Sequence, residues 1–418
     1  MRADRMNEVS IRPPCVLGRS IVDRAFLADP YPTYRALREA GPLHWSEEFF
    51  GGAWLLTRHQ DVETVLRDAR FSAKRTGGWV NDLEHERGEL SRFQRLFGRA
   101  LLFLDSPDHS RLRNLMQSAF RPDALTRLRP EIERIADELL DSLNGVGPFD
   151  FIAQVARPLP VRVISHILGI VGADTEEVTI WSDDLADFIG APTPTREQAC
   201  RAQSSLLAMT RFLQDQLETK RTARGDDLLS ALLLQRERGT LHDDAELLAQ
   251  CAMLLFAGHE TTRNLLGNGM QALLSHTEQW QLLVKDPNLV PDAVREILRY
   301  DSPVQYTGRR VISDLLFHGQ LLRRGELVLP LIGAANRDPA RHADPEELDV
   351  RRTDRGTLSF GSGPHVCLGA ALTRIEADVV FRQMLARWPD LRLASAEPQW
   401  FANPAYRGLK TLSLRPAM

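Results

Sequence analysis

The residue of this chain whose surroundings best suit a chemical role is Cys367, in the run FGSGPHVCLG at residues 360–369. Gly361 and Gly363 permit backbone conformations that other residues avoid, as a tight loop pressed against a flat partner requires. A helical pattern follows at once, which places Cys367 at a helix N-terminus, where the macrodipole and free N–H groups stabilise a thiolate. The alternative is an inert buried cysteine after a glycine-rich turn.

A second polar group is the run AGHETT at residues 257–262. Gly258 removes a side chain where a diatomic ligand could fit, and the Thr261 hydroxyl can donate to the carbonyl of Ala257 four residues back. Glu260 adds an ionisable group beside that gap. Polar groups inside an apolar helix are costly unless they are used. The alternative, a polar helix end that faces solvent, requires the helix to stop here, but its pattern continues.

Helices are expected to position both groups. The longest helical pattern covers residues 243–275, where Asp243 and Glu246 form a capping box. Residues 247–257 are apolar nearly all round, which predicts a helix that runs through the interior. Strand-like runs are few and short, and no β-α-β rhythm appears. The sequence therefore predicts a mainly α fold with small β-sheets, as a single domain over 1–418 with an N-terminal extension at 1–30.

Composition excludes several classes of protein. Hydrophobic residues make up 43% of the 418 residues and charged residues 26%, which is too apolar for a disordered chain. The net charge of −4 disfavours a nucleic-acid binder. Four scattered cysteines without a C-x-x-C pair favour a reduced compartment. The N-terminus lacks an apolar signal region, and the longest near-apolar run, 247–258, is too short for a bilayer. We therefore expect a cytoplasmic protein that binds neither membrane nor nucleic acid.

Four runs of the sequence, the two above among them, resemble signatures of the cytochrome P450 family. Residues 360–369 match every fixed position of its haem loop, F-G-x-G-x-H-x-C-x-G. Residues 257–262 are similar to its oxygen-activation motif, A-G-x-D/E-T, and Glu296-Ile297-Leu298-Arg299 to its structural E-x-x-R pair. The run ANRDP at 335–339 also resembles a recurrent family segment. The resemblance covers residues 31–414, with the motifs in the family's order.

The resemblance implies a cytochrome P450 fold with a long central helix over the cofactor, heme b (iron protoporphyrin IX), which is not covalently attached. Cys367 would ligate the iron, Glu260 and Thr261 would deliver protons to bound O2, and Glu296 and Arg299 would form a buried structural pair. Further haem contacts are implied at His109, Arg113, Ala257, Gly258, Arg309, Phe360, Gly361, His365 and Gly369. Arg310 directly follows Arg309 and leaves that assignment open. The substrate would meet Trp79, Phe93, Met253, Phe256, Val304 and Phe401, although such residues are as often plain core.

The implied activity is a haem-thiolate monooxygenase that hydroxylates a lipophilic small molecule in secondary metabolism or catabolism. No part of the chain resembles a flavin or nicotinamide domain, so we expect a ferredoxin and a ferredoxin reductase as electron donors, and a monomer. Arg111 and Arg374 could receive an acidic partner, or could be ordinary solvated charges. The alternatives are a peroxide-driven enzyme, epoxidation, desaturation or oxidative coupling, a haem gas sensor, and a cysteine hydrolase that uses Cys367 and His365.

Overall fold

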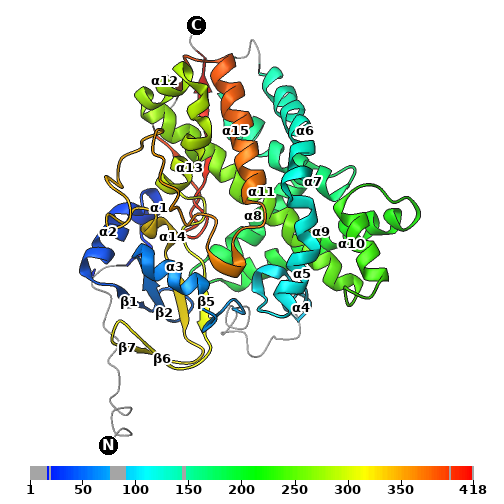
Figure 1. Cartoon of the computed structure of the whole chain (residues 1–418), viewed down its shortest axis with the longest axis horizontal. Helices are drawn as coiled ribbons and strands as arrows, with labels where there is room; N and C mark the ends of the chain where they lie inside the picture. Colours follow the sequence, from blue (N-terminus) through cyan, green and yellow to red (C-terminus); the bar gives the residue numbers. More distant parts are fainter. Residues whose placement is uncertain (1–16, 18–19, 76–90, 144–146, 395–396, 417–418) are drawn as a thin grey trace, which may run out of the picture.

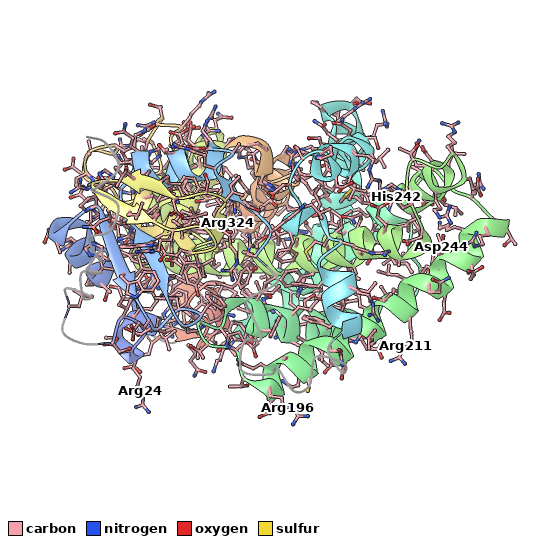
Figure 2. The ribbon with its side chains drawn as sticks, turned by 90° about the horizontal axis from the view of Figure 1, so that it is seen from below. Arg24, Arg196, Arg211, His242, Asp244 and Arg324 are labelled. Atoms are coloured by element: carbon pink, nitrogen blue, oxygen red, sulfur yellow. The ribbon has the colours of Figure 1, made fainter. Side chains whose placement is uncertain are left out.

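The computed structural model describes residues 17, 20–75, 91–143, 147–394 and 397–416. Helices make up most of this part of the chain, and the strands gather mainly on one side (Figure 1). The predicted mainly α fold with small β-sheets is therefore confirmed. Charged side chains such as Arg24, Arg196, Arg211 and Arg324 project outward from the ribbon (Figure 2).

The longer helices form the half of the molecule on the right of Figure 1. The α-helices are α1 (Arg24–Ala28), α2 (Tyr31–Ala40), α3 (His59–Arg67), α4 (Ser91–Phe97), α5 (Asp108–Met116), α6 (Pro122–Asp141), α7 (Pro158–Leu168), α8 (Thr175–Gly190), α9 (Arg196–Thr222), α10 (Leu228–Glu237), α11 (Asp244–Ser275), α12 (Thr277–Lys285), α13 (Val290–Tyr300), α14 (Ile332–Ala335) and α15 (Ala370–Arg387). A π-helical turn (Ile152–Ala156) and short 3-10 turns join some of them.

The largest sheet has the strand order β1-β2-β8-β5-β3, with β2 parallel to β8 and the other pairs antiparallel. Three smaller sheets pair β10 with β11, β6 with β7, and β12 with both β4 and β9. The strands are β1 (Leu43–Ser46), β2 (Ala53–Leu56), β3 (Phe71–Ser72), β4 (Phe149–Asp150), β5 (Arg309–Val311), β6 (Leu315–Phe317), β7 (Gln320–Leu322), β8 (Leu327–Pro330), β9 (Arg392–Leu393), β10 (Gln399–Trp400), β11 (Leu409–Thr411) and β12 (Ser413–Arg415).

Helix α11 is the predicted long helix. Its N-cap is Asp243, whose carboxylate accepts a hydrogen bond from the N–H of Glu246 at 2.7 Å. Nearly all of its residues are buried, because α7, α8, α9, α13 and α15 pack around it (Figure 1). A helix with apolar residues on every side needs such a cover, so the periodicity of the sequence agrees with its central place.

Part of the N-terminal extension expected at residues 1–30 packs against the rest of the chain. Ile21 and Phe26 are 1% and 3% exposed, and both belong to a hydrophobic cluster that includes Tyr34 of α2 and Leu55 of β2. The described residues before Pro30 therefore form part of the packed structure beside the largest sheet. The apolar pairs Ile21-Val22 and Phe26-Leu27 give too short a pattern to show this in the sequence.

Candidate cofactor and active site

The loop that carries Cys367 is closed by its own backbone. The N–H of Cys367 donates to the carbonyl of Phe360 at 2.8 Å, and the N–H of Val366 donates to Gly363 at 3.1 Å. Helix α15 begins at Ala370 with Gly369 as its N-cap, so the prediction that Cys367 itself opens the helix was wrong by a short turn. The thiol still lies just before the N-terminus of that helix.

Gly363 fixes the loop against α3. Its φ of +73° lies in the region that favours glycine, and a Cβ there would lie 3.0 Å from the Cα of Arg67 and 3.1 Å from the carbonyl oxygen of Leu66. Gly361 likewise has a φ of +72°. The predicted need for glycine is met, and at Gly363 its cause is close contact with the backbone of α3.

The electrostatic surroundings of Cys367 differ from those of Cys251, a buried cysteine elsewhere in the fold. Burial raises the pKa of the Cys251 thiol to about 12. The side chain of Cys367 is exposed, yet the protein around it also raises its thiol pKa by desolvation. A hydrogen bond from the N–H of Gly369 and the guanidinium groups of Arg113 and Arg374 act in the opposite direction, toward the thiolate. Binding of a metal cation would supply the remaining stabilisation of the thiolate.

His109, Arg113 and His365 come together beside this loop, as the resemblance implies. The rings of His109 on α5 and His365 lie with centroids 4.0 Å apart. The pKa of His365 falls to about 3, first through burial and then through Arg309, His109, Arg75 and Arg113. A histidine held neutral among cations, with its ring against another histidine, is a poor general base for Cys367, which disfavours the cysteine hydrolase.

Arg309 is the member of the Arg309–Arg310 pair that joins this cluster. It is 5% exposed on β5, and burial, followed by the charge of Arg75, lowers its pKa to about 9. Its charge also lowers the pKa of His109, after burial and Arg113. Arg310, in contrast, donates to the carbonyl of Gly325 at 2.7 Å. The alternation of side chains along a strand thus separates the two arginines.

Arg75 belongs to the same cluster and was missed by the sequence reasoning. It is 7% exposed, donates to the carbonyl of Gly308 at 3.2 Å and lies over the Phe103 ring at 4.9 Å. Desolvation lowers its pKa to about 10. Arg75 stands outside every recognised motif, so no signal in the sequence distinguishes it from a surface arginine.

The donors of this cluster fit a haem. Within the described residues, Arg75, Arg113 and Arg309 form no ion pair with a carboxylate, and the Nε2 of His109 is buried without a hydrogen-bond partner. Buried guanidinium groups require an anionic partner. The two propionates of a haem whose iron lies at Cys367 would provide two carboxylates beside these donors. The residues present are therefore chemically complementary to this cofactor.

The polar residues of α11 make two separate sets of contacts. The Thr261 hydroxyl donates to the carbonyl of Ala257 at 3.1 Å, as predicted. Glu260 is 3% exposed, lies 2.6 Å from a guanidinium nitrogen of Arg263, and accepts a hydrogen bond from Asn264 at 3.0 Å. Burial raises the pKa of Glu260 in spite of Arg263. Ala257 is exposed within an otherwise buried stretch, and Thr261 is half-buried.

The ion pair of Glu260 continues toward the surface. Arg263 is 1% exposed and lies 2.7 Å from a carboxylate oxygen of Asp183 on α8, whose side chain is 35% exposed. The three groups thus form a charged path from the centre of α11 to the outside. Glu260 was predicted from the sequence. Its neighbour Arg263, three residues later on the same helix, was overlooked, and Asp183 was not predictable because α8 and α11 are distant in the chain.

The prediction that Gly258 leaves room for a diatomic ligand was wrong. A Cβ at this position would point toward α7 and lie 3.2 Å from Cγ1 of Ile164. The absence of a side chain therefore serves the close packing of α11 against α7. The neighbouring His259 is fully buried, and neither of its ring nitrogens has a hydrogen-bond partner in the described part of the chain.

Glu296 and Arg299 form the buried pair that the sequence predicted. Both residues are 2% exposed on α13, and two hydrogen bonds of 2.8 Å join their side chains. Arg299 also donates to the carbonyls of Asn336 and Pro345. The Asn336 side chain accepts from the N–H of Leu358 at 2.7 Å, just before the cysteine loop. The pair thus supports that loop through the predicted ANRDP segment.

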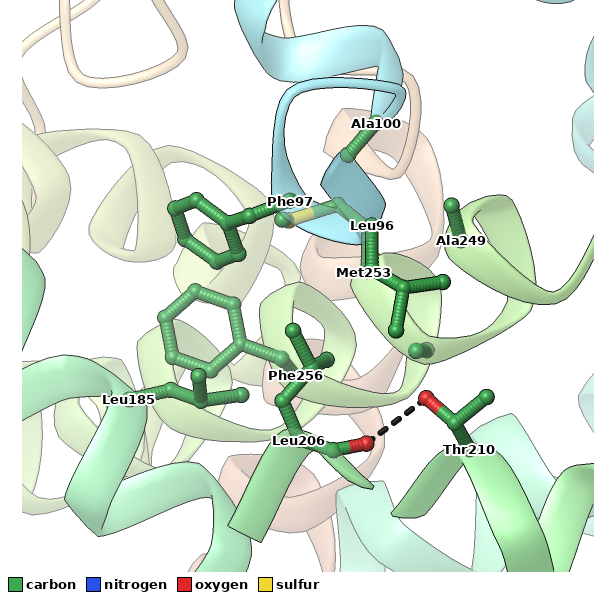
Figure 3. A pocket seen from close by; sticks show the side chains of 10 residues that line it. Leu96, Phe97, Ala100, Leu185, Leu206, Thr210, Ala249, Met253 and Phe256 are labelled. Atoms are coloured by element: carbon green, nitrogen blue, oxygen red, sulfur yellow. Dashed lines mark hydrogen bonds between the residues drawn. The ribbon is translucent and has the colours of Figure 1, made fainter. Parts of the chain in front are cut away.

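The expected substrate residues divide into groups. Met253 and Phe256 line a small apolar cavity of about 10 Å³ between α4, α8, α9 and α11 (Figure 3). Phe93 stacks on Phe97, which also lines this cavity, at 5.0 Å. Val304 forms a β-bridge with Tyr406, whose ring lies edge-on to Phe256 at 6.2 Å.

The two remaining predicted substrate residues are Phe401 and Trp79. Phe401 lies against the Arg263 guanidinium at 5.0 Å, which places it beside the path from Glu260 to Asp183. Trp79 lies outside the described residues. The cavity in Figure 3 has room for little more than one water molecule, so these side chains enclose an apolar region that is closely packed.

Of the two arginines expected to meet an acidic partner, only Arg374 lines an open groove. This groove, of about 400 Å³, also contains Arg129 and Arg382, and Arg374 lies over the Phe360 ring of the cysteine loop at 4.8 Å. Arg111 instead pairs with Glu246 at 2.6 Å inside the contact of α5 with α11. Among the described helices, none is long and apolar enough to cross a membrane.

Comparisons with known proteins agree with the motifs. A family model described as Cytochrome P450 matches residues 279–389. Cytochrome P450 107B1 of Saccharopolyspora erythraea is 39% identical over 401 residues, with 94% of this chain and 96% of that protein covered. Vitamin D(3) 25-hydroxylase of Pseudonocardia autotrophica is 38% identical, with 88% and 89% covered. The crystal structure of myxobacterial cytochrome P450 CYP267B1 in complex with myristic acid superposes with a TM-score of 0.88 at 34% identity, covering 95% of this chain and 99% of that one.

Proposed function

Because this chain belongs to the cytochrome P450 family of haem-dependent monooxygenases, we propose that it hydroxylates a C–H bond of a lipophilic small molecule with O2 as co-substrate. The observation that carries the proposal is the cluster of His109, Arg113 and Arg309 beside the thiol of Cys367. Arg309 is buried and Arg113 half-buried, neither pairs with a carboxylate of the described residues, and the Nε2 of His109 has no hydrogen-bond partner among them. This cluster is complementary to a dianionic cofactor whose metal ion takes a thiolate ligand.

The cofactor is heme b, held by Cys367 at the iron and by His109, Arg113, Arg309 and His365 at the propionates. When bound, a haem with a thiolate ligand supplies the activation of O2. Ala257 on α11, and Phe360, Gly361 and Gly369 in the cysteine loop, provide the surfaces against which the ring packs. Two features support these contacts. Gly361 has a positive φ, as a tight loop requires, and Ala257 is exposed and therefore free to contact the ring.

The catalytic proton donors are Thr261 and Glu260. The Thr261 hydroxyl donates a hydrogen bond to the carbonyl of Ala257, and its oxygen can accept one from a water molecule. Thr261 thus holds that water, as the immediate proton donor, at the half-buried face of α11. Glu260 takes protons from the surface through Asp183 and passes them on when its carboxylate leaves Arg263. The raised pKa of Glu260 supports this role, since it keeps a larger fraction of the carboxyl group protonated near neutral pH and therefore able to donate.

The substrate is an apolar molecule that contacts Phe93, Met253, Phe256 and Val304. Support comes from the names of two relatives, which state vitamin D(3) and myristic acid, both largely hydrocarbon. Phe401, which covers Arg263, and Trp79 complete the expected set. We assign the reaction to secondary metabolism or catabolism. The cytoplasmic location, the monomeric state and the single domain remain predictions.

Electrons come from an acidic ferredoxin that is reduced by its own reductase. In the groove, Asp378 pairs with Arg129 and Arg382. Arg374, which reaches both the groove and the cysteine loop, supports this partner. Association through such charges weakens as salt screens them. We expect the rate at limiting ferredoxin to fall with ionic strength, while turnover driven by peroxide does not.

The decisive experiment is the spectrum of the reduced protein under carbon monoxide. Wild type and Cys200→Ser should show the red-shifted band of thiolate-ligated haem, and Cys367→Ser should lose it. A correctly folded wild type without that band would refute the proposal. Turnover with ferredoxin and reductase, compared with turnover by peroxide alone, then separates a monooxygenase from a peroxide-driven enzyme. Product analysis distinguishes hydroxylation from epoxidation, desaturation or oxidative coupling.

A further inference from the structure

We propose that Arg75 and the hydroxyl of Tyr406 bind a carboxylate of the substrate, so that the natural substrate is an organic acid with a long apolar body. The inference rests on the proposed function, which it makes more specific. It adds a polar anchor to a region whose other expected contacts are apolar.

Arg75 is a buried cation without an anionic partner. Its side chain is 7% exposed, and among the described residues its hydrogen bond goes to the neutral carbonyl of Gly308 at 3.2 Å. The carboxylate of Asp105, which lies in the same part of the molecule, accepts hydrogen bonds from the Ser72 hydroxyl and the Ala73 N–H. A charge taken out of water without a partner is strongly destabilising, so this position is suited to an anion that arrives with a ligand.

Tyr406 places this cation beside the substrate region. Its backbone bridges Val304, and its ring meets Phe256 edge-on at 6.2 Å. Arg75 and Tyr406 contact the same segment, since Arg75 donates to the carbonyl of Gly308 and the backbone of Tyr406 bridges Val304 four residues earlier. Both Arg75 and Glu260 also act electrostatically on the phenol. Its hydroxyl donates no hydrogen bond to any described residue.

The two side chains together match a carboxylate. A guanidinium group presents parallel N–H donors to both oxygens of a carboxylate, and a phenol adds one more donor from a second direction. Burial raises the pKa of Tyr406 to about 12, so its hydroxyl stays protonated and able to donate at neutral pH. The surrounding residues Phe256 and Val304 are apolar, which fits the remainder of such an acid.

A propionate of the haem is the other carboxylate that Arg75 could meet, because Arg309 lies close enough to have its pKa lowered by Arg75. The two sources predict different results when Arg75 is changed. Loss of a substrate contact weakens the binding of acids alone. Loss of a propionate contact weakens retention of the haem and leaves the preference among ligands unchanged.

The test uses the holoenzyme and ligands that report their own binding. Imidazolyl-alkanoic acids of increasing chain length, and the matching methylamides, ligate the iron through imidazole and shift the Soret band. We expect wild type to bind the best acid about 10- to 100-fold more tightly than its methylamide. Arg75→Gln should remove most of this preference, Tyr406→Phe should reduce it about fivefold, and Arg75→Lys should restore part of it. Arg310→Gln, which alters an arginine that bonds Gly325, should keep it.

Three results would overturn the inference. One is the absence of a preference for the acid at every chain length in wild type. Another is a preserved preference in Arg75→Gln, particularly if haem transfer to apomyoglobin becomes faster, which would assign Arg75 to the propionates. A folded wild type that binds no haem would overturn the proposed function and this inference with it. If Arg75→Gln fails to fold, Tyr406→Phe and the wild-type ligand pairs still decide the question.

Discussion

The replacement of Glu296 by Gln tests whether the buried pair on α13 supports the cysteine loop. Glu296 and Arg299 are each 2% exposed, and Arg352 adds a second cation 3.1 Å from the same carboxylate. Removing one partner of a buried ion pair costs about 3–5 kcal/mol, because the other charge stays in a medium that solvates it poorly. Glutamine can still donate and accept hydrogen bonds, so the loss measures the charge.

The matched control is Glu218→Gln on α9. Glu218 and Arg221 have the same spacing in the chain and lie 3.1 Å apart, but their side chains are 56% and 39% exposed. Exposed pairs of this kind contribute about 0–1 kcal/mol. The free energy of unfolding of each holoenzyme would be measured by urea titration, with circular dichroism and the Soret band as separate probes.

We expect Glu296→Gln to lose about 4 kcal/mol, a large part of the stability of an ordinary domain, and Glu218→Gln to lose less than about 1 kcal/mol. The Soret transition of Glu296→Gln should also move to lower urea, since Arg299 reaches the loop through Asn336. Equal losses in the two variants would refute the argument that burial gives this pair its importance.

Three further substitutions test other parts of the site and its support. Burial raises the pKa of Glu376 on α15 to about 8 from 4.5, so the folded protein keeps a proton that the unfolded chain releases. The free energy of unfolding should therefore fall by up to a few kcal/mol as pH rises between these values. In melting curves taken at several pH values, Glu376→Gln should flatten this dependence. Thr261→Val should keep the haem spectrum but lower the product formed per electron consumed by about tenfold or more, with the difference appearing as peroxide. In thermal unfolding, Gly363→Ala should destabilise the protein by about 1–3 kcal/mol, because of the φ of +73° and the contact with α3. The control is Gly239→Ala, where φ is +75° but the space around the residue is open. It should lose only the smaller backbone contribution.

Motifs whose chemistry depends on local spacing could be read from the sequence. The hydrogen bond from Thr261 to Ala257 and the pair of Glu296 with Arg299 each lie within one helical turn, so the period of the helix alone brings their atoms together. The long buried helix α11 was predictable for the same reason, because an apolar surface on all sides requires cover on all sides.

Features set by tertiary contacts were not predictable. Arg75 joins the cationic cluster only because β3 and β5 pair across more than half of the chain, and Asp183 reaches Arg263 from another helix. The direction of Gly258 toward α7 depends on the rotation of α11 about its axis, which periodicity does not fix when every face is apolar. The choice between Arg309 and Arg310 likewise required the register of β5 against β8.

The fit of Gly363 against the backbone of α3 has a consequence for how the protein matures in the cell. The loop around Cys367 rests on residues made near the beginning of translation and on Arg299, made much later. A nascent chain released only as far as α13 lacks the thiol, and a chain without its first helices lacks the floor beneath the loop. We therefore expect haem to bind only after translation is complete. When haem is scarce, the apoprotein should be nearly complete in structure but incompletely ordered, and cellular proteases should degrade it.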